Sequence, residues 1–248
     1  MIEVWPGARR FEGGAEGVAT LHAFSFGGHY DPGNVGFGLL SACNEEALDV
    51  GAGFAEHPHR DTEIVTWVLD GELEHRDAEG NSALLGAGGL QVLSAAGGVR
   101  HSERNAGPGP LRFLQMWLHP DAYGGTPRYT ALPAPLPPGP GLRVLATGAE
   151  PAAPATAAPG GAPAPLRQRA ATLHGARPDT ASDTALPDAP YLYVHLARGA
   201  LTLVEGTRTA ALGAGDAARV TDARGVRART EGPAEYLVWE MHARPSYG

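Results

Sequence analysis

The chain has 248 residues, with a single cysteine, ten histidines and a formal net charge of −8 at pH 7. One cysteine cannot form an intramolecular disulfide, and the absence of a CxxC pair excludes a thiolate zinc site. The acidic balance argues against nucleic acid as a direct ligand, because binding phosphates requires an excess of cations. Any bound metal must therefore take most of its ligands from histidine.

The N-terminal stretch Met1–Pro6 has neither the basic region nor the apolar core of a signal peptide. No apolar run reaches the roughly 20 residues that a membrane helix needs. We therefore expect a cytoplasmic protein with no membrane association. The 35 glycines and 22 prolines favour many turns and disfavour a helical bundle.

Short runs of β-branched and aromatic residues, bounded by Gly, Asp and Asn, predict an all-β fold. In chain order the clearest runs are Glu63–Leu69, Gly89–Leu93, Leu111–Leu118, Leu142–Leu145, Tyr191–Leu196, Ala200–Val204 and Glu235–Met241. Asp70-Gly71 and Glu79-Gly80-Asn81 contain residues that tolerate positive φ, and we predict hairpin turns at both.

A change in composition near residue 130 predicts a domain boundary. Residues 1–130 would form an N-terminal domain that binds a metal, and residues 131–248 a C-terminal domain that does not. Residues 149–165 are rich in proline and alanine. Such a stretch buries little apolar surface, so we predict a loop there.

Two parts of the chain resemble each other at a constant offset. Leu85-Gly86-Ala87-Gly88 recurs as Leu212-Gly213-Ala214-Gly215, and Gly98-Val99-Arg100 falls on Gly225-Val226-Arg227. The repeat predicts one structural unit that occurs twice. The alternative is chance similarity in a chain rich in glycine and alanine.

Two pairs of candidate metal ligands occur in the first half. His57 and His59 are two residues apart, and so are His101 and Glu103. Residues i and i+2 of a strand point to the same face, so the members of each pair project together. Two neighbouring strands could then bring three imidazoles and a carboxylate onto one ion. Such ligands suit iron, nickel, copper, manganese or zinc and disfavour calcium or magnesium.

The spacing Gly51-x5-His57-x-His59-x3-Glu63 resembles the first cupin motif, and His101-x3-Asn105 resembles the end of the second. The chain departs from the second motif at Ser94, where a proline is expected, and His101 comes two residues late. Most of residues 1–130 resembles the pirin family, closest to its bacterial quercetin 2,3-dioxygenase branch. The segments that carry this resemblance are Phe24–Pro32, His57–Arg60, Leu69–Asp77, Val99–Glu103 and Thr126–Tyr129.

The resemblance implies a bicupin: two jelly-roll β-barrel domains in one chain, with a non-haem Fe(II) site in the first. By match to the family motif, the metal ligands would be His57, His59, His101 and Glu103. Glu63 is a rival carboxylate, since it has the same strand parity as the first two histidines and many cupins use this glutamate. We expect Glu103 to be the ligand and Glu63 to lie behind the ligands. The alternative for Glu63 is a strand residue held by hydrogen bonds.

The second copy lacks these ligands. His174 and His195 lie in it, but neither belongs to a same-face pair, and we expect structural roles for both. We therefore predict one metal per chain. Under the gapless alignment, the ligand positions fall on Ala228 and Thr230 and near Ala185 and Pro187.

The resemblance implies a metal-dependent dioxygenase that cleaves flavonols such as quercetin with O2 and releases CO. Fe(II) is the first choice of metal, with Ni, Co, Mn, Cu or Zn as alternatives. Glu103, or Glu63 if it is not a ligand, would accept the proton of the flavonol 3-hydroxyl. One alternative is a non-enzymatic, metal- or redox-responsive regulator that binds a protein partner. Another is a cupin acting on a different small enolisable substrate.

Overall fold

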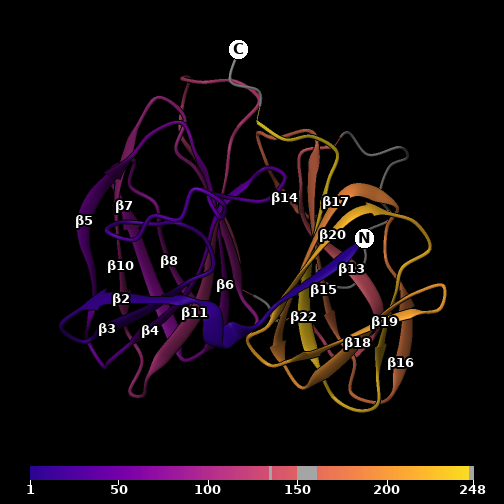
Figure 1. Ribbon diagram of the computed structural model, residues 1–248. Coiled ribbons are helices and arrows are strands. Elements are labelled where there is room, and N and C mark those ends of the chain that lie inside the picture. The colour runs from indigo at the N-terminus through magenta and orange to yellow at the C-terminus, as the bar shows by residue number, and fades with distance from the viewer. Residues whose placement is uncertain (134–135, 150–160, 246–248) are drawn as a thin grey trace.

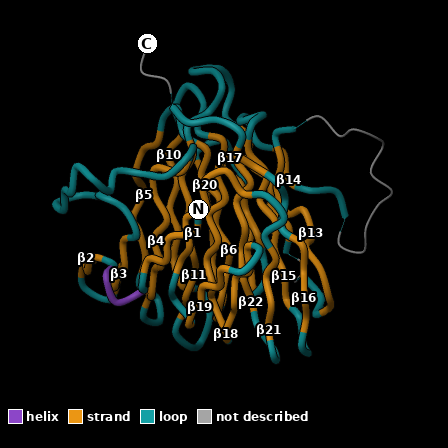
Figure 2. Tube along the Cα trace, turned by 45° about the vertical axis from the view of Figure 1, so that its right-hand side comes forward, coloured by secondary structure: helices purple, strands orange, loops and turns teal. Residues whose placement is uncertain are grey.

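A computed structural model of the chain describes residues 1–133, 136–149 and 161–245 (Figure 1). Within these ranges the strands form four sheets, and the one helix is the short 3-10 helix η1 (Gly7–Arg9). Figure 2 shows the same arrangement of strands joined by loops. The predicted all-β fold is confirmed. In the described residues, no helix has the length and apolarity needed to cross a bilayer.

The first unit contains a seven-stranded and a four-stranded sheet. The larger sheet consists of β2 (Phe11–Ala15), β3 (Val18–His22), β4 (Leu40–Leu48), β6 (Glu63–Asp70), β9 (Leu90–Ser94), β11 (Leu111–Leu118) and β12 (Arg128–Leu132). Its spatial order is β12-β9-β6-β11-β4-β3-β2. The smaller sheet consists of β5 (Gly53–His59), β7 (Glu72–Asp77), β8 (Ser82–Gly86) and β10 (Val99–Asn105), in the order β5-β10-β7-β8.

The second unit has the same composition of sheets. Its larger sheet consists of β1 (Ile2–Trp5), β13 (Gly139–Thr147), β14 (Ala164–Pro165), β15 (Ala171–Arg177), β17 (Ala189–Arg198), β20 (Ala217–Ala223) and β22 (Glu235–Met241). Its order is β1-β20-β17-β22-β15-β13-β14. The smaller sheet consists of β16 (Ser182–Ala185), β18 (Ala200–Glu205), β19 (Arg208–Gly213) and β21 (Arg227–Thr230), in the order β16-β21-β18-β19.

The two units therefore repeat one strand plan, as the sequence repeat predicts. Gly71 and Gly199 occupy matching positions, with φ of 80° and 84°. A Cβ at either would collide with a carbonyl oxygen, that of Pro110 or of Pro233, so both positions require glycine. The described fold is the bicupin that the pirin resemblance implies, with two β-barrel units in one chain.

The two predicted hairpin turns have different outcomes. Glu79-Gly80-Asn81 does join the paired strands β7 and β8. The prediction at Asp70-Gly71 is wrong, because β6 and β7 belong to different sheets and the chain crosses from one sheet to the other there. A glycine turn signal marks a sharp change of direction, and it does not identify which strand the chain pairs with afterwards.

The N-terminal strand does not follow the predicted division at residue 130. β1 pairs antiparallel with β20, so the N-terminus lies against the second unit (Figure 1). In the first unit β12 occupies the equivalent edge, beside β9, and it extends to Leu132. The division at residue 130 remains our proposal for the domain organisation. We call β1 an exchanged strand, because it precedes the first unit in the sequence and pairs with the second.

The predicted loop 149–165 is wrong at its C-terminal end. Ala164–Pro165 form β14, which pairs with β13, because Ala164 and the following Leu166 are buried in an apolar cluster. Residues 150–160 of that prediction lie outside the described residues.

The two units contact each other through their seven-stranded sheets (Figure 1). Two tryptophans cross this contact: Trp67 Nε1 donates to Glu235 Oε1 at 2.7 Å, and Trp239 Nε1 approaches Met116 Sδ at 3.1 Å. All four side chains are buried. One face of β6 and β11 thus packs against the second unit. The side chains on the opposite face of these strands point into the interior of the first unit.

Candidate metal centre and its cavity

Three histidines converge on the inner face of the small sheet of the first unit. β5 and β10 pair antiparallel, with His101 opposite His57 and Val99 opposite His59. The ring centroids are 4.5 Å apart for His57 and His101, 4.9 Å for His57 and His59, and 5.0 Å for His59 and His101. The structure therefore brings together the three imidazoles that the sequence singles out.

The nitrogens of these rings suit a metal. His57 Nδ1 lies 2.8 Å from the carbonyl oxygen of Ala55, and donating there leaves the Nε2 lone pair of the neutral ring free. His59 Nε2 and His101 Nε2 are buried and have no hydrogen-bond partner. Burial, reinforced by the neighbouring histidines, lowers the pKa of His59 to about 4 and that of His101 to about 2. Neutral imidazoles with unshared lone pairs are what a divalent transition metal binds.

Glu103 is buried between the two sheets, with 1% of its surface exposed. Gln91 Nε2 donates to its Oε1 at 2.7 Å, and Gln115 Nε2 donates to its Oε2 at 2.8 Å. Each amide is oriented by an aromatic donor, since Tyr129 Oη donates to Gln91 Oε1 and Trp117 Nε1 to Gln115 Oε1. Burial raises the pKa of Glu103 to about 7, although both amides favour the ionised form.

Glu103 and the three histidines do not form a single cluster. One candidate ligand group contains His57, His59 and His101, and a second contains His75, His101 and Glu103. The β5–β10 register shifts between His101 and Glu103, so the carboxylate does not continue the pairing of the imidazoles. His101 belongs to both groups and connects the histidine cluster to the buried acid.

Glu63 lies apart from both groups. The chain leaves β5 after His59 and turns at Asp61, whose φ is 52°, before β6 begins in the other sheet. His59 and Glu63 therefore lie on different strands, and the alternation of side chains along β5 does not predict the direction of Glu63. Ser94 Oγ donates to Glu63 Oε2 at 2.6 Å, and the backbone N–H of Arg167 donates to the same oxygen at 2.9 Å. This arrangement matches the alternative of a strand residue held by hydrogen bonds.

Sequence reasoning missed His75, which is buried behind His101. The two Nδ1 atoms are 3.5 Å apart, and His75 Nε2 lies 3.5 Å from Asp77 Oδ2. The ring of His75 stacks on Tyr129, with a centroid separation of 4.2 Å and an angle of 8°. A signal was present in the sequence: His75 and Asp77 are also a same-face pair at strand spacing.

An open cavity of about 800 Å³ reaches His57, His59 and Glu103. Phe26, Phe54 and Trp117 contribute aromatic surface, and the ring of Trp117 lies edge-on to His59 at 5.0 Å. Polar groups line another part of the wall, among them Glu46, whose pKa burial raises to about 7. A cavity of this size and character suits a small, flat aromatic molecule.

The corresponding positions of the second unit hold no metal ligands. Ala228 of β21 is opposite Thr184 of β16, as His101 is opposite His57. Leu186 N donates to Val226 O next to this pair, and Leu186 and Ala228 belong to the apolar interior of the unit. Both candidate ligand groups found among the described residues lie in the first unit. The sequence repeat predicts matches near Ala185 and Pro187, and the strand pairing gives the adjacent residues Thr184 and Leu186.

Comparison with known proteins finds a family match and relatives with related names. The family description "Pirin" matches residues 7–118. A Mycobacterium tuberculosis protein named "Putative quercetin 2,3-dioxygenase" is 42% identical over 238 residues, covering 92% of this chain and 89% of that protein. The "Quercetin 2,3-dioxygenase" of Escherichia coli is 45% identical over 111 residues, covering 44% of this chain and 48% of that protein.

Solved structures share the fold. The Escherichia coli pirin YhhW, in complex with nickel(II), aligns with a TM-score of 0.84 at 26% identity, covering 98% of this chain and 100% of that one. A quercetin 2,3-dioxygenase from Acinetobacter baumannii aligns with a TM-score of 0.73 at 16% identity, covering 98% of this chain and 79% of that one.

Proposed function

The chain belongs to the pirin family, and on that premise we propose that it is a metal-dependent dioxygenase that cleaves flavonols such as quercetin with O2. The observation that carries the proposal is the cluster of His57, His59 and His101, in which His59 Nε2 and His101 Nε2 are buried and unpartnered, beside an aromatic cavity of about 800 Å³ that His57 and His59 line. The names of the relatives in Mycobacterium tuberculosis and Escherichia coli support the choice of reaction.

We propose one divalent transition metal per chain, held by His57, His59 and His101, with Glu103 as the fourth ligand. The unpartnered nitrogens support the histidine ligands, since a buried imidazole nitrogen without a partner is costly unless a ligand binds it. Glu103 as the fourth ligand is supported by the match to the family motif and by the candidate group that it forms with His101 and His75. Fe(II) is our first choice, and nickel, which the Escherichia coli pirin binds, is an alternative. A bound metal would supply Lewis acidity toward an oxyanion and redox chemistry toward O2.

Glu103 is our candidate for accepting the proton of the flavonol 3-hydroxyl. Its carboxyl group is buried beside the histidine cluster, where it can accept a proton from a hydroxyl bound next to it. Gln91 and Gln115 fix its two oxygens, so that the group is held in position before the substrate binds. We assign no such role to Glu63, because its side chain is held by Ser94 and Arg167.

The cavity walls would orient the substrate. Phe26, Phe54 and Trp117 offer surfaces for a planar ring system and keep water from its apolar part. Glu46, which accepts a hydrogen bond from Thr20 Oγ1, places a polar group where a flavonol hydroxyl could bind. Cleavage consumes one O2 per flavonol, both oxygen atoms enter the depside product, and one ring carbon leaves as CO.

The test combines elemental analysis with an aerobic quercetin assay on the same preparation, loaded separately with Fe, Ni, Co, Mn or Cu. We expect about one metal per chain. We also expect quercetin to be consumed, as followed by its absorbance, with one mole of CO released per mole of quercetin. His101→Ala, which removes a proposed ligand, should lose metal and turnover. His174→Ala is the matched control, since His174 is a second-unit histidine paired with Glu240. Stoichiometric metal without turnover for all five ions would overturn the proposal. A partner captured in only one metal oxidation state would then favour the regulator.

A further inference from the structure

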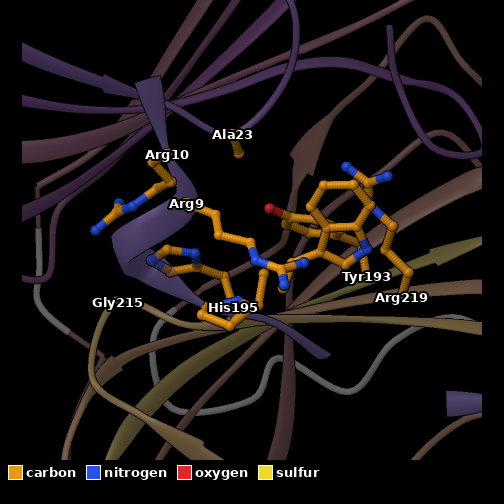
Figure 3. A pocket seen from close by; sticks show the side chains of 10 residues that line it. Arg9, Arg10, Ala23, Tyr193, His195, Gly215 and Arg219 are labelled. Atoms are coloured by element: carbon orange, nitrogen blue, oxygen red, sulfur yellow. The ribbon is translucent and has the colours of Figure 1, made fainter. Parts of the chain in front are cut away.

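A second cavity lies where the N-terminal segment meets the second unit (Figure 3). Its volume is about 20 Å³, and it shares no lining residue with the cavity at the histidines. The lining includes Trp5 of β1, Arg9 of η1, His195 of β17 and Arg219 of β20. One small occupant fits, because a water needs roughly 10–15 Å³ of such space.

The wall of this cavity carries buried polar atoms that have no hydrogen-bond partner. Arg219 is 7% exposed; its Nη2 donates to Asn34 Oδ1, but its Nε has no acceptor. Trp5 Nε1 is likewise buried and unpartnered, and the guanidinium of Arg219 lies 3.8 Å from the centroid of that indole. His195 is 2% exposed, and neither ring nitrogen has a partner. Buried donors of this kind are nearly always satisfied in native proteins.

The charge of Arg219 also lacks a contacting counter-charge. Among the ion pairs of the described residues, Arg10 pairs with Glu45 at 2.8 Å, whereas neither Arg9 nor Arg219 pairs with a carboxylate. The neighbouring Asp216 accepts hydrogen bonds from the backbone N–H groups of Gly7 and Gly213.

Two other acidic groups near Arg219 do not compensate its charge. Burial raises the pKa of the Cys43 thiol to about 11 and that of Tyr193 well above its usual range, so both are neutral at pH 7. Burial lowers the pKa of Arg219, and Glu3, on β1, opposes that shift by charge attraction but forms no ion pair with it. The rings of Trp5, Phe24 and Phe37 lie near the guanidinium and offset part of its desolvation. A contacting anion would offset more of it.

We infer that this cavity binds one small monovalent inorganic anion of about the size of chloride. The anion would accept hydrogen bonds from Trp5 Nε1 and Arg219 Nε, whose side chains contact each other, while His195 lines another part of the same wall. Arg9, an exposed residue whose side chain reaches the cavity in Figure 3, adds a cation at its outer side. A water molecule would leave the charge of Arg219 uncompensated, and a phosphate is too large for the space.

The anion would link elements that come from distant parts of the chain. Trp5 belongs to the exchanged strand β1, whereas His195 and Arg219 belong to β17 and β20 of the second unit. An anion that binds the folded state alone stabilises it in proportion to its occupancy. We therefore expect chloride to stabilise the attachment of the N-terminal segment.

Two measurements test the site directly. In crystals soaked in bromide, we expect an anomalous peak within hydrogen-bond distance of Arg219 Nε. In urea unfolding at constant ionic strength, with gluconate as the replacement anion, chloride at 100 times its dissociation constant should raise the folded-to-unfolded ratio by about 100-fold. Neither measurement depends on metal or turnover, so their outcome is independent of the proposed dioxygenase activity.

Two variants assign the effect to this cavity. Trp5→Phe retains a ring beneath Arg219 and removes one N–H donor, and it should weaken the chloride dependence by about tenfold. Arg219→Gln should abolish the dependence, and Arg208→Gln, at an exposed position of β19, should leave it unchanged. If Arg219→Gln does not fold, the Trp5→Phe result decides. A bromide-soaked cavity that holds only water, or equal chloride dependence in Trp5→Phe and Arg208→Gln, would overturn the inference.

Discussion

His101 lies directly opposite His57 in the pairing of β10 with β5, and the centroids of the two rings are 4.5 Å apart. The cluster therefore depends on strand register as much as on residue identity. A slip of one residue would turn one ring toward the other face of the sheet. The pairs Val99–His59 and Arg100–Pro58 on the same two strands fix this register.

Removing one imidazole from the cluster should strongly reduce metal binding. His57→Ala, His59→Ala or His101→Ala each deletes one of three converging nitrogens, and we expect at least a tenfold loss of affinity, because the remaining donors no longer complete a site. Metal per chain after dialysis against a competing chelator measures the effect. His174→Ala, in the second unit, is the matched control and should retain full metal content.

The two candidate glutamates should respond differently to the same substitution. Glu103→Gln replaces a buried acid next to His101 and should weaken metal binding, whereas Glu63→Gln alters a side chain held by Ser94 and Arg167 and should not. Parallel chelator titrations of the two variants measure the difference. The reverse result would transfer the ligand role to Glu63 and so follow the first cupin motif.

His75 should act on the metal through His101. His75→Phe retains a flat ring against Tyr129 and removes the nitrogen that lies 3.5 Å from His101 Nδ1. Loss of such a supporting contact typically costs 10- to 100-fold in metal affinity, and we expect a loss of about tenfold. The folded fraction, followed by circular dichroism, should stay close to that of the wild type. Unchanged affinity in a folded His75→Phe variant would show that this histidine has no part in the site.

Glu46 should make the metal-free protein less stable as pH rises. Burial raises the pKa of Glu46 from 4.5 to about 7, so the folded state binds its proton more tightly than the unfolded state does. Its stabilising contribution is complete below pH 4.5 and is lost as pH rises to about 7, which amounts to at most about 3 kcal/mol. Urea unfolding of the wild type and of Glu46→Gln across this range should give stability curves that converge or cross. Curves that remain parallel would contradict the prediction, and Glu12→Gln, at an exposed position on β2, is the control.

The local part of the site could be predicted from the sequence, because strand side chains alternate with period two. That rule alone places His57 with His59 and His101 with Glu103 on shared faces. It fails for Glu63, since a residue with positive φ at Asp61 ends the strand before Glu63 is reached. Which strands lie beside each other is not encoded locally, so the contact of His75 with His101 was missed. The exchange of β1 was missed for the same reason, because its partner β20 follows more than 200 residues later.

The exchange of β1 also determines how the chain can be divided. A fragment beginning at residue 131 would lack β1 and would leave one side of β20 without its partner over the four residues Ala217–Val220. An uncovered strand edge readily pairs with another chain, so such a fragment should self-associate. Moving Met1–Pro6 to the C-terminal end of that fragment, through a linker, would restore the missing pairing within one molecule. The first six residues therefore belong to one unit by sequence and to the other by folding.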